Sequence, residues 1–401
     1  MIRPAASTSP AVLPRVLFVD QTGQLGGAEL SLLDLARGYR GACAVALLAD
    51  GPFRERLEAA GVETHILPLS RSAAGVGRAA GPLRVASAGP AALGVVRRLA
   101  RLARGFDTLY ANTQKAWVLG AGAALLAGKP SVWHLRDILT ADHFSTANRR
   151  VAVTLANRRA QHVICNSQAT ADAFVAAGGH AKLTRVVYNG IDPTRFGVHA
   201  AEPTARSSTA TWQRLGLPIP ESAPVAAVFG RLSAWKGQHV AIEALRHAPD
   251  LHLVIVGEAL FGEDNYAAQL RHRAADPALA GRVHLTGFCD DVPALMHAAD
   301  VVVHCSTSPE PFGRVVVEAM LCGRPVIASD AGGTAEIVRD GDTGLLVKPD
   351  DPAALSAALR RLLAAPDRTA QMARAGQHDA AQRFSLETAV RGVEDVLRPS
   401  C

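Results

Sequence analysis

Short apolar runs alternate with longer amphipathic segments along most of the 401-residue chain. The short runs, rich in β-branched side chains, predict buried parallel strands, and the Ala/Leu/Arg-rich segments between them predict crossover helices. The runs form two series. The first predicts strands at 15–20, 42–49, 107–111, 131–134, 162–165 and 185–188, and the second at 225–230, 251–256, 283–285, 300–304, 325–328 and 345–347.

This pattern predicts an α/β fold with two Rossmann-like, doubly wound domains facing each other across a cleft. Residues 196–224 are rich in Ser, Thr, Pro and Ala and lack a strand pattern, so the connection between the domains is placed there. We therefore expect a first domain at 1–200, a linker at 201–224 with an entry helix near 211–215, a second domain at 225–382, and a last helix within 383–401.

Composition agrees with a globular protein of this size, because 49% of the residues are hydrophobic and 19% are charged. The longest apolar stretch, 118–128, is too short to span a bilayer. Residues 1–14 lack the apolar segment of a signal peptide, which predicts a cytoplasmic protein and argues against a periplasmic solute-binding protein. Six scattered cysteines without a C-x-x-C pair predict reduced thiols, with no disulfide and no structural zinc.

Charge is unevenly distributed along the chain. Residues 1–200 hold 23 Lys and Arg against 12 Asp and Glu, a net of +11, whereas the remainder holds 19 against 24, a net of −5. The excess positive charge therefore lies on the first domain and is expected to serve the binding partner of that domain. A predicted helix near 90–105 places Arg97, Arg101 and Arg104 on one face with Arg98 beside it, which suits the inner face of an anionic membrane or a lipid-linked acceptor. A solvated helix face is the alternative.

The strongest chemical signal is a pair of carboxylates around a Phe-Gly turn, Glu310 and Glu318. The loop that carries Glu310 follows a buried strand, so it emerges at the carboxyl edge of a parallel sheet, where α/β folds bind ligands. A helix that starts at Gly313 would direct its first N–H groups, those of Gly313, Arg314 and Val315, at a diphosphate. Carboxylates accept hydrogen bonds from vicinal hydroxyls, so Glu318 suits a ribose and Glu310 a sugar.

The spacing of Glu310 and Glu318, with Phe312 and Gly313 between them, resembles the signature of retaining GT-B glycosyltransferases of family 4. The resemblance spans nearly the whole chain and is strong from about 225 to 349. It is carried further by segments similar to the family in the same order, namely Gly26-Gly27-Ala28-Glu29, His134, Asn189-Gly190, Gly230-Arg231, Lys236-Gly237, 323–338 and 344–347.

The resemblance implies a GT-B fold in which the last helix, at 385–397, crosses back to pack on the first domain. It also implies a transferase that moves a sugar from a UDP- or GDP-sugar to a hydroxyl acceptor with retention. In such enzymes the departing phosphate takes the acceptor proton, so no strong nucleophile is needed. The implied catalytic residues are His134, Glu310, Arg231 and Lys236. The implied donor site consists of Gly26, Gly27, Gly230, Arg231, Lys236, Gly257, Phe288, Glu310, Phe312, Gly313, Arg314, Val315 and Glu318.

Arg231 and Lys236 follow the first predicted strand of the second domain and would offer two positive charges to a diphosphate leaving group. This stabilisation needs no metal ion, and we expect no metal and no cofactor. Asp340-Gly-Asp342 matches an Asp-x-Asp metal motif literally, but its setting is turn chemistry. A solvated Arg/Lys pair at a loop is the alternative for the two cations.

Gly26 and Gly27 follow the first predicted strand and precede a helix, so their N–H groups can face a phosphate or an acceptor. A tight strand-to-helix turn needs glycine in any case. Neither this segment nor Gly230-Arg231 has the spacing of a dinucleotide or P-loop motif, which argues against a dehydrogenase.

Other positions leave a structural alternative open. His134 lies at a predicted strand end, where contact with the transferred sugar competes with a capped strand-end histidine. Asn189-Gly190 and Asn166 fit ordinary turn and cap chemistry, and His304-Cys305 fits packing at a strand end. Gly257 is followed by Glu258-Ala259 where the family often has G-x-G, so the loop with Phe288 is the expected contact for the base.

Three functions remain after these observations. The first is the glycosyltransferase, with a nucleotide-sugar donor, a hydroxyl acceptor and no nucleic acid as partners. A GT-B nucleotide-sugar epimerase would act on the donor alone. A catalytically silent module would bind sugar nucleotides or glycans without turnover.

Overall fold

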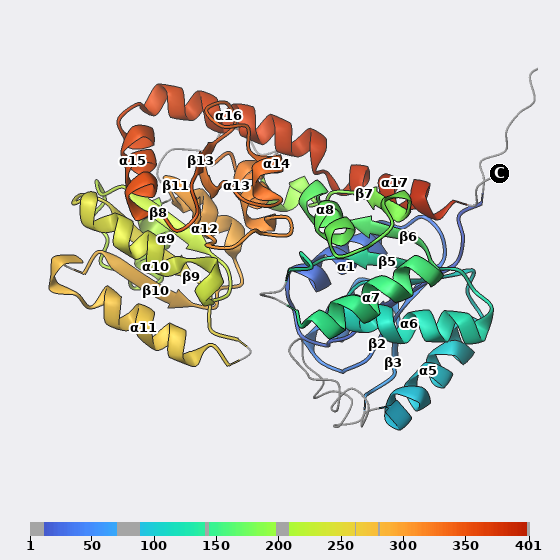
Figure 1. Cartoon of the computed structure of the whole chain (residues 1–401). Helices are drawn as coiled ribbons and strands as arrows, with labels where there is room; N and C mark the ends of the chain where they lie inside the picture. The colour runs from blue at the N-terminus through green and yellow to red at the C-terminus, as the bar shows by residue number, and fades with distance from the viewer. Residues whose placement is uncertain are drawn as a thin grey trace, which may run out of the picture. The chain divides into compact units, whose positions relative to one another are not determined.

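The apolar runs of the sequence form two parallel β-sheets (Figure 1). The computed structural model describes residues 12–69, 89–140, 144–197, 208–260, 262–279 and 281–398. Seven strands make up the first sheet, in the order β3-β2-β1-β4-β5-β6-β7, and six make up the second, in the order β10-β9-β8-β11-β12-β13. The chain divides into two units, Met1–Gly190 with Leu386–Cys401, and Ile191–Ser385.

The first unit is an α/β layer structure around the seven-stranded sheet. Its strands are β1 (Val16–Asp20), β2 (Cys43–Leu47), β3 (Glu63–Ile66), β4 (Thr108–Ala111), β5 (Ser131–Leu135), β6 (Ala160–Cys165) and β7 (Thr184–Val186). Its helices are α1 (Gly27–Gly38), α2 (Pro52–Ala59), α5 (Gly89–Ala103), α6 (Gln114–Ala127), α7 (Thr146–Arg159), α8 (Gln168–Ala176), the 3₁₀ turn η1 (Ala181–Leu183) and α17 (Leu386–Leu397).

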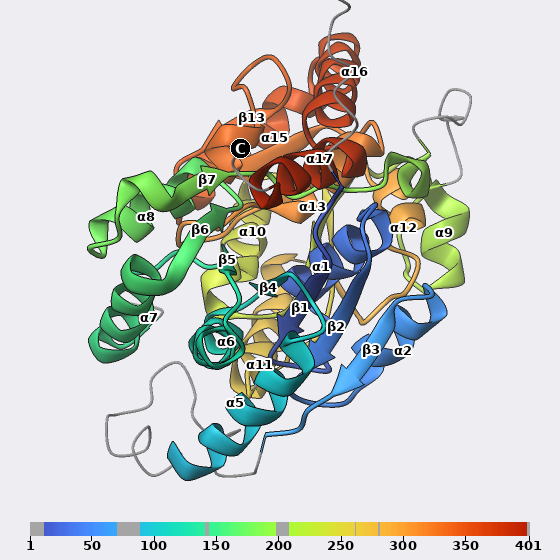
Figure 2. The ribbon, with the colours of Figure 1, turned by 90° about the vertical axis from the view of Figure 1, so that its right-hand side faces the viewer.

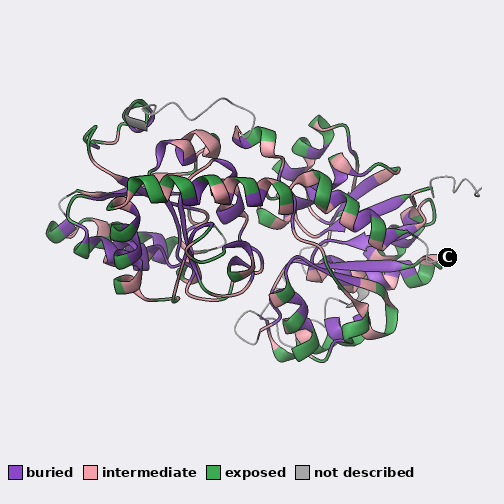
Figure 3. Cartoon of the chain, turned by 90° about the horizontal axis from the view of Figure 1, so that it is seen from above, coloured by how far each residue is buried: buried purple, intermediate pink, exposed green. Residues whose placement is uncertain are grey.

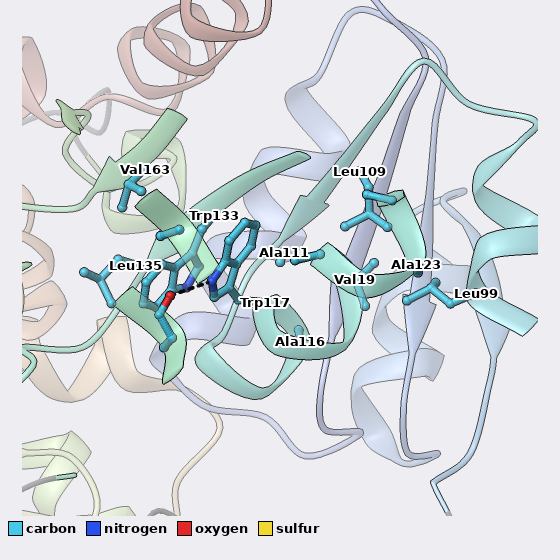
Figure 4. Close-up of a cluster of buried hydrophobic side chains, with 14 of the residues drawn as sticks. Val19, Leu99, Leu109, Ala111, Ala116, Trp117, Ala123, Trp133, Leu135 and Val163 are labelled. Carbon is cyan, nitrogen blue, oxygen red and sulfur yellow. Dashed lines mark hydrogen bonds between the residues drawn. The ribbon is translucent and has the colours of Figure 1, made fainter. Parts of the chain in front are cut away.

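Alternate residues of the first sheet face two separate helical layers, as the period of a strand requires. Leu17 and Val19 of β1 pack toward α5, α6, α7 and α8, whereas Val16 and Phe18 pack toward α1, α2 and α17. Figure 2 shows α6 and α7 on one side of the strands and α1 on the other. In the first layer Trp117 stacks on Trp133 with ring centroids 5.6 Å apart (Figure 4).

The last helix, α17, belongs to the first unit although it is the final element of the chain. Val390 and Val393 join the apolar layer over α1, and Gly38 gives Val390 room because a Cβ there would lie 2.7 Å from Cγ2 of Val390. The buried carboxylate of Glu394 accepts hydrogen bonds from the backbone N–H and the guanidinium of Arg40. Packing and an ion pair thus hold the C-terminal helix on α1.

The second unit repeats the architecture around the six-stranded sheet. Its strands are β8 (Val225–Phe229), β9 (His252–Val256), β10 (Val283–Gly287), β11 (Val301–His304), β12 (Val326–Ser329) and β13 (Leu345–Val347). Its helices are η2 (Pro193–Phe196), α9 (Ser208–Arg214), η3 (Ala234–Lys236), α10 (Gln238–Ala244), η4 (Leu245–His247), α11 (Asp264–Ala274), η5 (Pro277–Leu279), α12 (Val292–Ala298), α13 (Arg314–Leu321), α14 (Thr334–Ile337), α15 (Pro352–Leu363) and α16 (Pro366–Arg383). Figure 3 shows that buried residues concentrate in the strands and exposed residues on the helices.

The structure differs from the sequence-based expectation at one strand and at the borders of the units. The strand β3 lacks an apolar run, since it is a partly exposed edge strand with the sequence Glu-Thr-His-Ile. The first unit ends at Gly190 and not at 200, because Ile191 pairs with Ser385 and Phe196 is buried within the second unit. Part of the expected linker, 201–207, lies outside the described residues.

Candidate active site

Loops at the carboxyl edge of the second sheet are tied together by backbone contacts. The loop after β8 reaches the loop after β11, where the N–H of Thr307 donates to the carbonyl of Trp235 at 2.8 Å. Gly237 has φ +70°, and a Cβ there would lie 1.9 Å from the carbonyl oxygen of Cys305. Only glycine permits this approach. The loop that carries Lys236 is therefore held against the end of β11.

Glu310 is the centre of the polar cluster that these loops form. Its Oε2 accepts a hydrogen bond from Nζ of Lys236 at 2.6 Å, and the two side chains are 12% and 22% exposed, respectively. Burial alone would raise the pKa of Glu310, but the charge of Lys236 and the hydrogen bond from His304 outweigh it and lower the pKa well below its usual range. Glu310 is thus a carboxylate at neutral pH. It can accept hydrogen bonds there, but it cannot donate a proton.

Two residues that the sequence reading assigned to packing or left out belong to the same cluster. Nε2 of His304 lies 3.3 Å from Oε2 of Glu310, and Oγ of Ser306 lies 3.1 Å from Nε2 of His304 and 3.3 Å from Oε2. The strand β11 ends at His304, so the side chain points from the strand end into the loop that carries Glu310. The sequence did offer a signal for His304, because it is an ionisable residue at the end of a buried strand, six positions before Glu310.

The loop with Glu310 leads directly into helix α13. Gly313, the N-cap, has φ +107°, and a Cβ there would lie 2.6 Å from Cγ2 of Thr334. The N–H of Val316 donates to the carbonyl of Gly313 at 3.0 Å, so the N–H groups of Arg314 and Val315 precede the first bond of the helix. These two groups stand at the positive end of the helix, as expected for an anion site.

The guanidinium of Arg314 contacts the carboxylate of Glu318 one turn along α13, at 3.2 Å. Both side chains are largely covered, at 10% and 13% exposed. The sequence suggested only a backbone role for Arg314, but its side chain also neutralises Glu318. A ribose that binds Glu318 must share this carboxylate with Arg314.

Phe312 has a structural placement that differs from the expected donor contact. The residue is 2% exposed, and its ring packs edge to face on Phe384 with centroids 5.7 Å apart. Because the apolar ring is buried, its role in this structure is to anchor the loop between Glu310 and α13.

Glycines also shape the carboxyl edge of the second sheet at the ends of β8, β9 and β10. Gly230 and Gly257 have φ +127° and +141°, and a Cβ on Gly257 would lie 2.1 Å from the carbonyl oxygen of Gly230. The N–H of Gly257 donates to the carbonyl of Gly287 at 2.8 Å. Phe288 follows directly and is 64% exposed. An aromatic ring so exposed is available for a flat ligand such as a nucleobase. Arg231 is half-buried beside Gly230.

The carboxyl edge of the first sheet carries a second polar cluster. Asp20 ends β1, Asn112 follows β4 and Arg136 follows β5, on three adjacent strands. Nδ2 of Asn112 donates to Asp20 at 2.6 Å, Nε of Arg136 donates to Asn112 at 2.9 Å, and Arg136 also donates to Asn189. These buried groups form one chain of hydrogen bonds. Only Asn189 among them was considered from the sequence, and there as turn chemistry.

Gly26 and Gly27 lie at the start of α1, beside this second cluster. Gly26 is the N-cap, and a Cβ there would lie 2.7 Å from Oε2 of Glu29. Burial, together with the negative charge of Asp20, raises the pKa of Glu29 to about 8. Burial also raises the pKa of Asp20 to about 6, against the hydrogen bond from Asn112. The tight strand-to-helix turn thus brings a largely protonated carboxyl group close to the end of β1.

His134 is enclosed in the first unit, which differs from its expected contact with the sugar. The strand β5 extends to Leu135, so His134 is a residue within the strand, paired with Ile164, and not the residue that follows it. The side chain is buried, and Nδ1 forms a hydrogen bond with the hydroxyl of Tyr110. Burial and the charge of Arg136 lower the pKa of His134 well below its usual value. In this structure Leu135 ends the strand and Arg136 follows it, so Arg136 lies at the sheet edge where His134 was expected.

The basic helix predicted near 90–105 corresponds to α5. Val95 and Leu99 face the core, whereas Arg97, Arg98, Arg101 and Arg104 are exposed. Leu93 is also exposed, at 44%. The segment that precedes α5, residues 70–88, lies outside the described residues.

The described residues contain neither a metal-binding cluster nor a helix that could span a membrane. Asp340 accepts a hydrogen bond from the N–H of Leu346, and Asp342 contacts Arg339, so both carboxylates of the Asp-x-Asp sequence serve a turn. The described residues contain no cluster of three or more His, Cys, Asp or Glu with metal-ligand geometry. Within 12–69, 89–140, 144–197, 208–260, 262–279 and 281–398, no helix is both long and apolar enough to cross a membrane.

Comparison with known proteins identifies the family. The model of "Glycosyl transferases group 1" matches residues 213–379, and that of "Glycosyltransferase Family 4" matches residues 25–195. Alpha-maltose-1-phosphate synthase of Mycolicibacterium smegmatis is 30% identical over 349 residues, which cover 81% of this chain and 87% of that protein. The chain belongs to the family 4 glycosyltransferases. The two family models fall on the two units of the structure, so the family and the GT-B fold expected from the sequence are confirmed.

Solved structures match this chain over almost its whole length. Anabaena HepE, in its complex with UDP and glucose, is 41% identical, has a TM-score of 0.84, and the match covers 95% of this chain and 98% of HepE. LpsE of Rhizobium meliloti, a lipopolysaccharide core biosynthesis glycosyltransferase, is 33% identical over 174 residues, 43% of this chain. That match covers 49% of LpsE, so the chain spans about half the length of this curated relative.

Proposed function

We propose that this protein is a retaining glycosyltransferase that moves a hexose from a UDP-sugar to a hydroxyl acceptor without a metal ion. The observation that carries the proposal is the arrangement at the carboxyl edge of the second sheet. It combines an ionised Glu310 paired with Lys236, the N-terminus of α13, and Glu318 one turn into that helix. UDP is favoured over other nucleotides because HepE, a structure with 41% identity over nearly the full chain, is a complex with UDP and glucose.

Each residue of the edge has a role that follows from its charge and position. Lys236 and Arg231 contact the diphosphate, together with the N–H groups of Arg314 and Val315 at the start of α13. Glu318 accepts hydrogen bonds from the ribose hydroxyls, and Glu310 accepts them from the hydroxyls of the transferred sugar. Because negative charge grows on the departing diphosphate as the bond to the sugar breaks, the cations favour the transition state over the bound donor.

Retention of configuration fits the charge state of these groups. The pKa of Glu310 lies well below its usual range, so this carboxylate cannot act as a general acid near neutral pH. When a departing phosphate oxygen takes the acceptor proton on the same face of the sugar, the acceptor needs no protein base and the leaving group needs no protein acid. The two cations supply the leaving-group stabilisation that a metal ion would otherwise give.

The acceptor is proposed to bind the first unit, near the chain of hydrogen bonds from Asp20 through Asn112 to Arg136. These buried polar groups lie at the carboxyl edge of three adjacent strands, where sheets of this kind bind ligands. The four exposed arginines of α5 suit an acceptor linked to an anionic lipid at a membrane surface. Vesicles with and without anionic lipid would test that part of the proposal.

The decisive experiment measures release of UDP from UDP-glucose by the purified protein with and without EDTA, with GDP-mannose as a comparison donor. We expect UDP release that EDTA does not reduce. Proton NMR of the released glucose should show the α-anomer first, since retention preserves the configuration of the donor. A β-anomer would contradict retention, a loss with EDTA would contradict the metal-free reaction, and a donor epimer without hydrolysis would favour the epimerase. Binding without turnover would favour the non-catalytic module.

A further inference from the structure

Three hydrogen-bonding groups converge on a single oxygen of Glu310. Lys236 reaches Oε2 at 2.6 Å, while His304 and Ser306 both reach it at 3.3 Å. Among the residues that the structure describes, no donor bonds to the other oxygen, Oε1. The carboxylate is therefore fixed through one oxygen, which leaves Oε1 as the oxygen that a ligand can use.

The surroundings of His304 favour the tautomer that donates to Glu310. Its Nδ1 is buried and has no hydrogen-bond partner in the described part of the chain, whereas Nε2 lies near Oε2 of Glu310 and Oγ of Ser306. With the proton on Nδ1, a buried N–H would lack an acceptor and the lone pair of Nε2 would face a carboxylate. With the proton on Nε2, the ring donates toward Oε2 of Glu310 and Oγ of Ser306, and the Ser306 hydroxyl in turn donates to Oε2 of Glu310.

The proposed function explains why Glu310 needs the hydrogen bonds from His304 and Ser306. When Lys236 turns to the diphosphate of a bound donor, Glu310 loses part of its strongest contact while it remains nearly buried. A buried carboxylate without donors is costly and would rotate or take up a proton. His304 stays in place, because it belongs to β11 and its carbonyl accepts a hydrogen bond from Ser329 at 3.4 Å, and Ser306 is within 3.1 Å of its ring.

We propose that His304 and Ser306 are positioning residues, which hold Oε2 of Glu310 by two hydrogen bonds so that Oε1 stays aimed at the sugar after the donor has engaged Lys236. This inference rests on the proposed function and deepens it. It predicts that the two residues affect the sugar step through Glu310 and leave binding of the nucleotide itself nearly unchanged.

The test compares His304→Leu, which removes the donor, with His304→Gln, whose amide can donate from a similar position. We measure kcat for UDP release from UDP-glucose, and the Kd for UDP by calorimetry. We expect His304→Leu to lower kcat by about 10- to 100-fold, the scale of one hydrogen bond to a charged group, and His304→Gln to recover most of it. The Kd for UDP should change by less than about twofold in each variant, which also shows that the variants are folded.

A second background separates positioning from a general structural effect. In Glu310→Gln the carboxylate is absent, so adding His304→Leu should change kcat by less than about twofold. The same 10- to 100-fold loss in that background, or an equal loss in the Kd for UDP, would overturn the proposal. Ser306→Ala, a smaller change, should follow the same pattern with a smaller loss, and an effect that persists without Glu310 would again refute it.

Failure of the proposed function would look different. If the wild type binds UDP-glucose but releases no UDP, the transferase proposal fails. The positioning role is then read from the ratio of the Kd for UDP-glucose to the Kd for UDP. His304→Leu should raise that ratio and His304→Gln should restore it, and an unchanged ratio overturns the positioning role. A wild type that binds no nucleotide sugar overturns both.

Discussion

Replacing Lys236 by Met tests whether the contact with Glu310 is a strong buried ion pair. Methionine keeps an unbranched apolar side chain, one heavy atom shorter than that of lysine, and removes the charge. In the described part of the chain the variant leaves Glu310, 12% exposed, with the hydrogen bonds from His304 and Ser306 alone. It also removes the ammonium group that lies 4.3 Å from the ring centroid of Trp235.

The expected magnitude follows from the geometry. At the 2.6 Å separation of Lys236 Nζ and Glu310 Oε2, two unit charges attract by about 6 kcal/mol at an effective dielectric constant of about 20. Desolvation offsets much of this attraction in the intact pair, but removal of one partner leaves the other buried without a counter-ion, at a cost of about 3–5 kcal/mol. Because both side chains are partly exposed, we expect Lys236→Met to destabilise the second unit by about 2–4 kcal/mol.

The assay is urea unfolding of the wild type, Lys236→Met, Glu310→Gln and the double variant. A coupling free energy of about 2 kcal/mol is expected, with the double variant more stable than Lys236→Met. The matched control is the exposed pair of Arg246 and Asp276 in the same unit, with a contact of 2.5 Å and side chains 32% and 33% exposed. There the corresponding coupling should be only about 0.2–1 kcal/mol.

The pH dependence of the destabilisation in Lys236→Met checks independently that Glu310 is ionised. Without Lys236 the pKa of Glu310 rises, so protonation at low pH relieves the unpaired charge. The destabilisation in Lys236→Met should therefore be larger at about pH 7.5 than at about pH 4.5. A coupling no greater than that of the Arg246 control, or a penalty that does not shrink as the pH falls, would refute the interpretation of a buried, ionised Glu310.

Three further predictions concern other parts of the molecule. Glu318→Gln should raise the Kd for UDP by about tenfold in calorimetry, because the ribose loses a charged acceptor, and a change below twofold would contradict that role. Gly237→Ala should lower the stability of the second unit by roughly 2–4 kcal/mol in urea unfolding, since its Cβ meets the carbonyl of Cys305 at φ +70°. The pKa of Glu29 is raised to about 8, so the folded state binds more protons than the unfolded state, and stability should fall as pH rises from about 4.5 to 8. Glu29→Gln should flatten that fall in melting temperature, and an unchanged slope would contradict the raised pKa.

The strands and the polar cluster at the carboxyl edge of the second sheet could be predicted because buried parallel strands leave a clear pattern in the sequence. Buried strands are continuous apolar runs, and the residues that follow them must meet at one edge, so the loops with Lys236 and Glu310 could be placed together. The edge strand β3 escaped this reading because a half-exposed strand needs no apolar run. The border at Gly190 escaped it because the pairing of Ile191 with Ser385 joins segments far apart in the chain.

Side-chain direction accounts for the remaining differences at the sites. His134 and Arg136 are two residues apart, and one more residue of strand placed the histidine inside the sheet and left the arginine at its edge. The ring of Phe312 is buried although its neighbours form the polar loop. The contacts of His304 with Glu310 depend on the fold of the loop, which a linear pattern does not specify.

The discontinuous first unit has a consequence for how the protein is made. Its seven strands are synthesised by Val186, yet one of its helical layers lacks α17 until Leu397 has left the ribosome. Until then the apolar surface that receives Val390 and Val393 has no cover, and Arg40 has no Glu394 to bind. The first unit therefore completes its folding only after the whole second unit has been synthesised, so in this protein the half that is translated first is the half that is finished last.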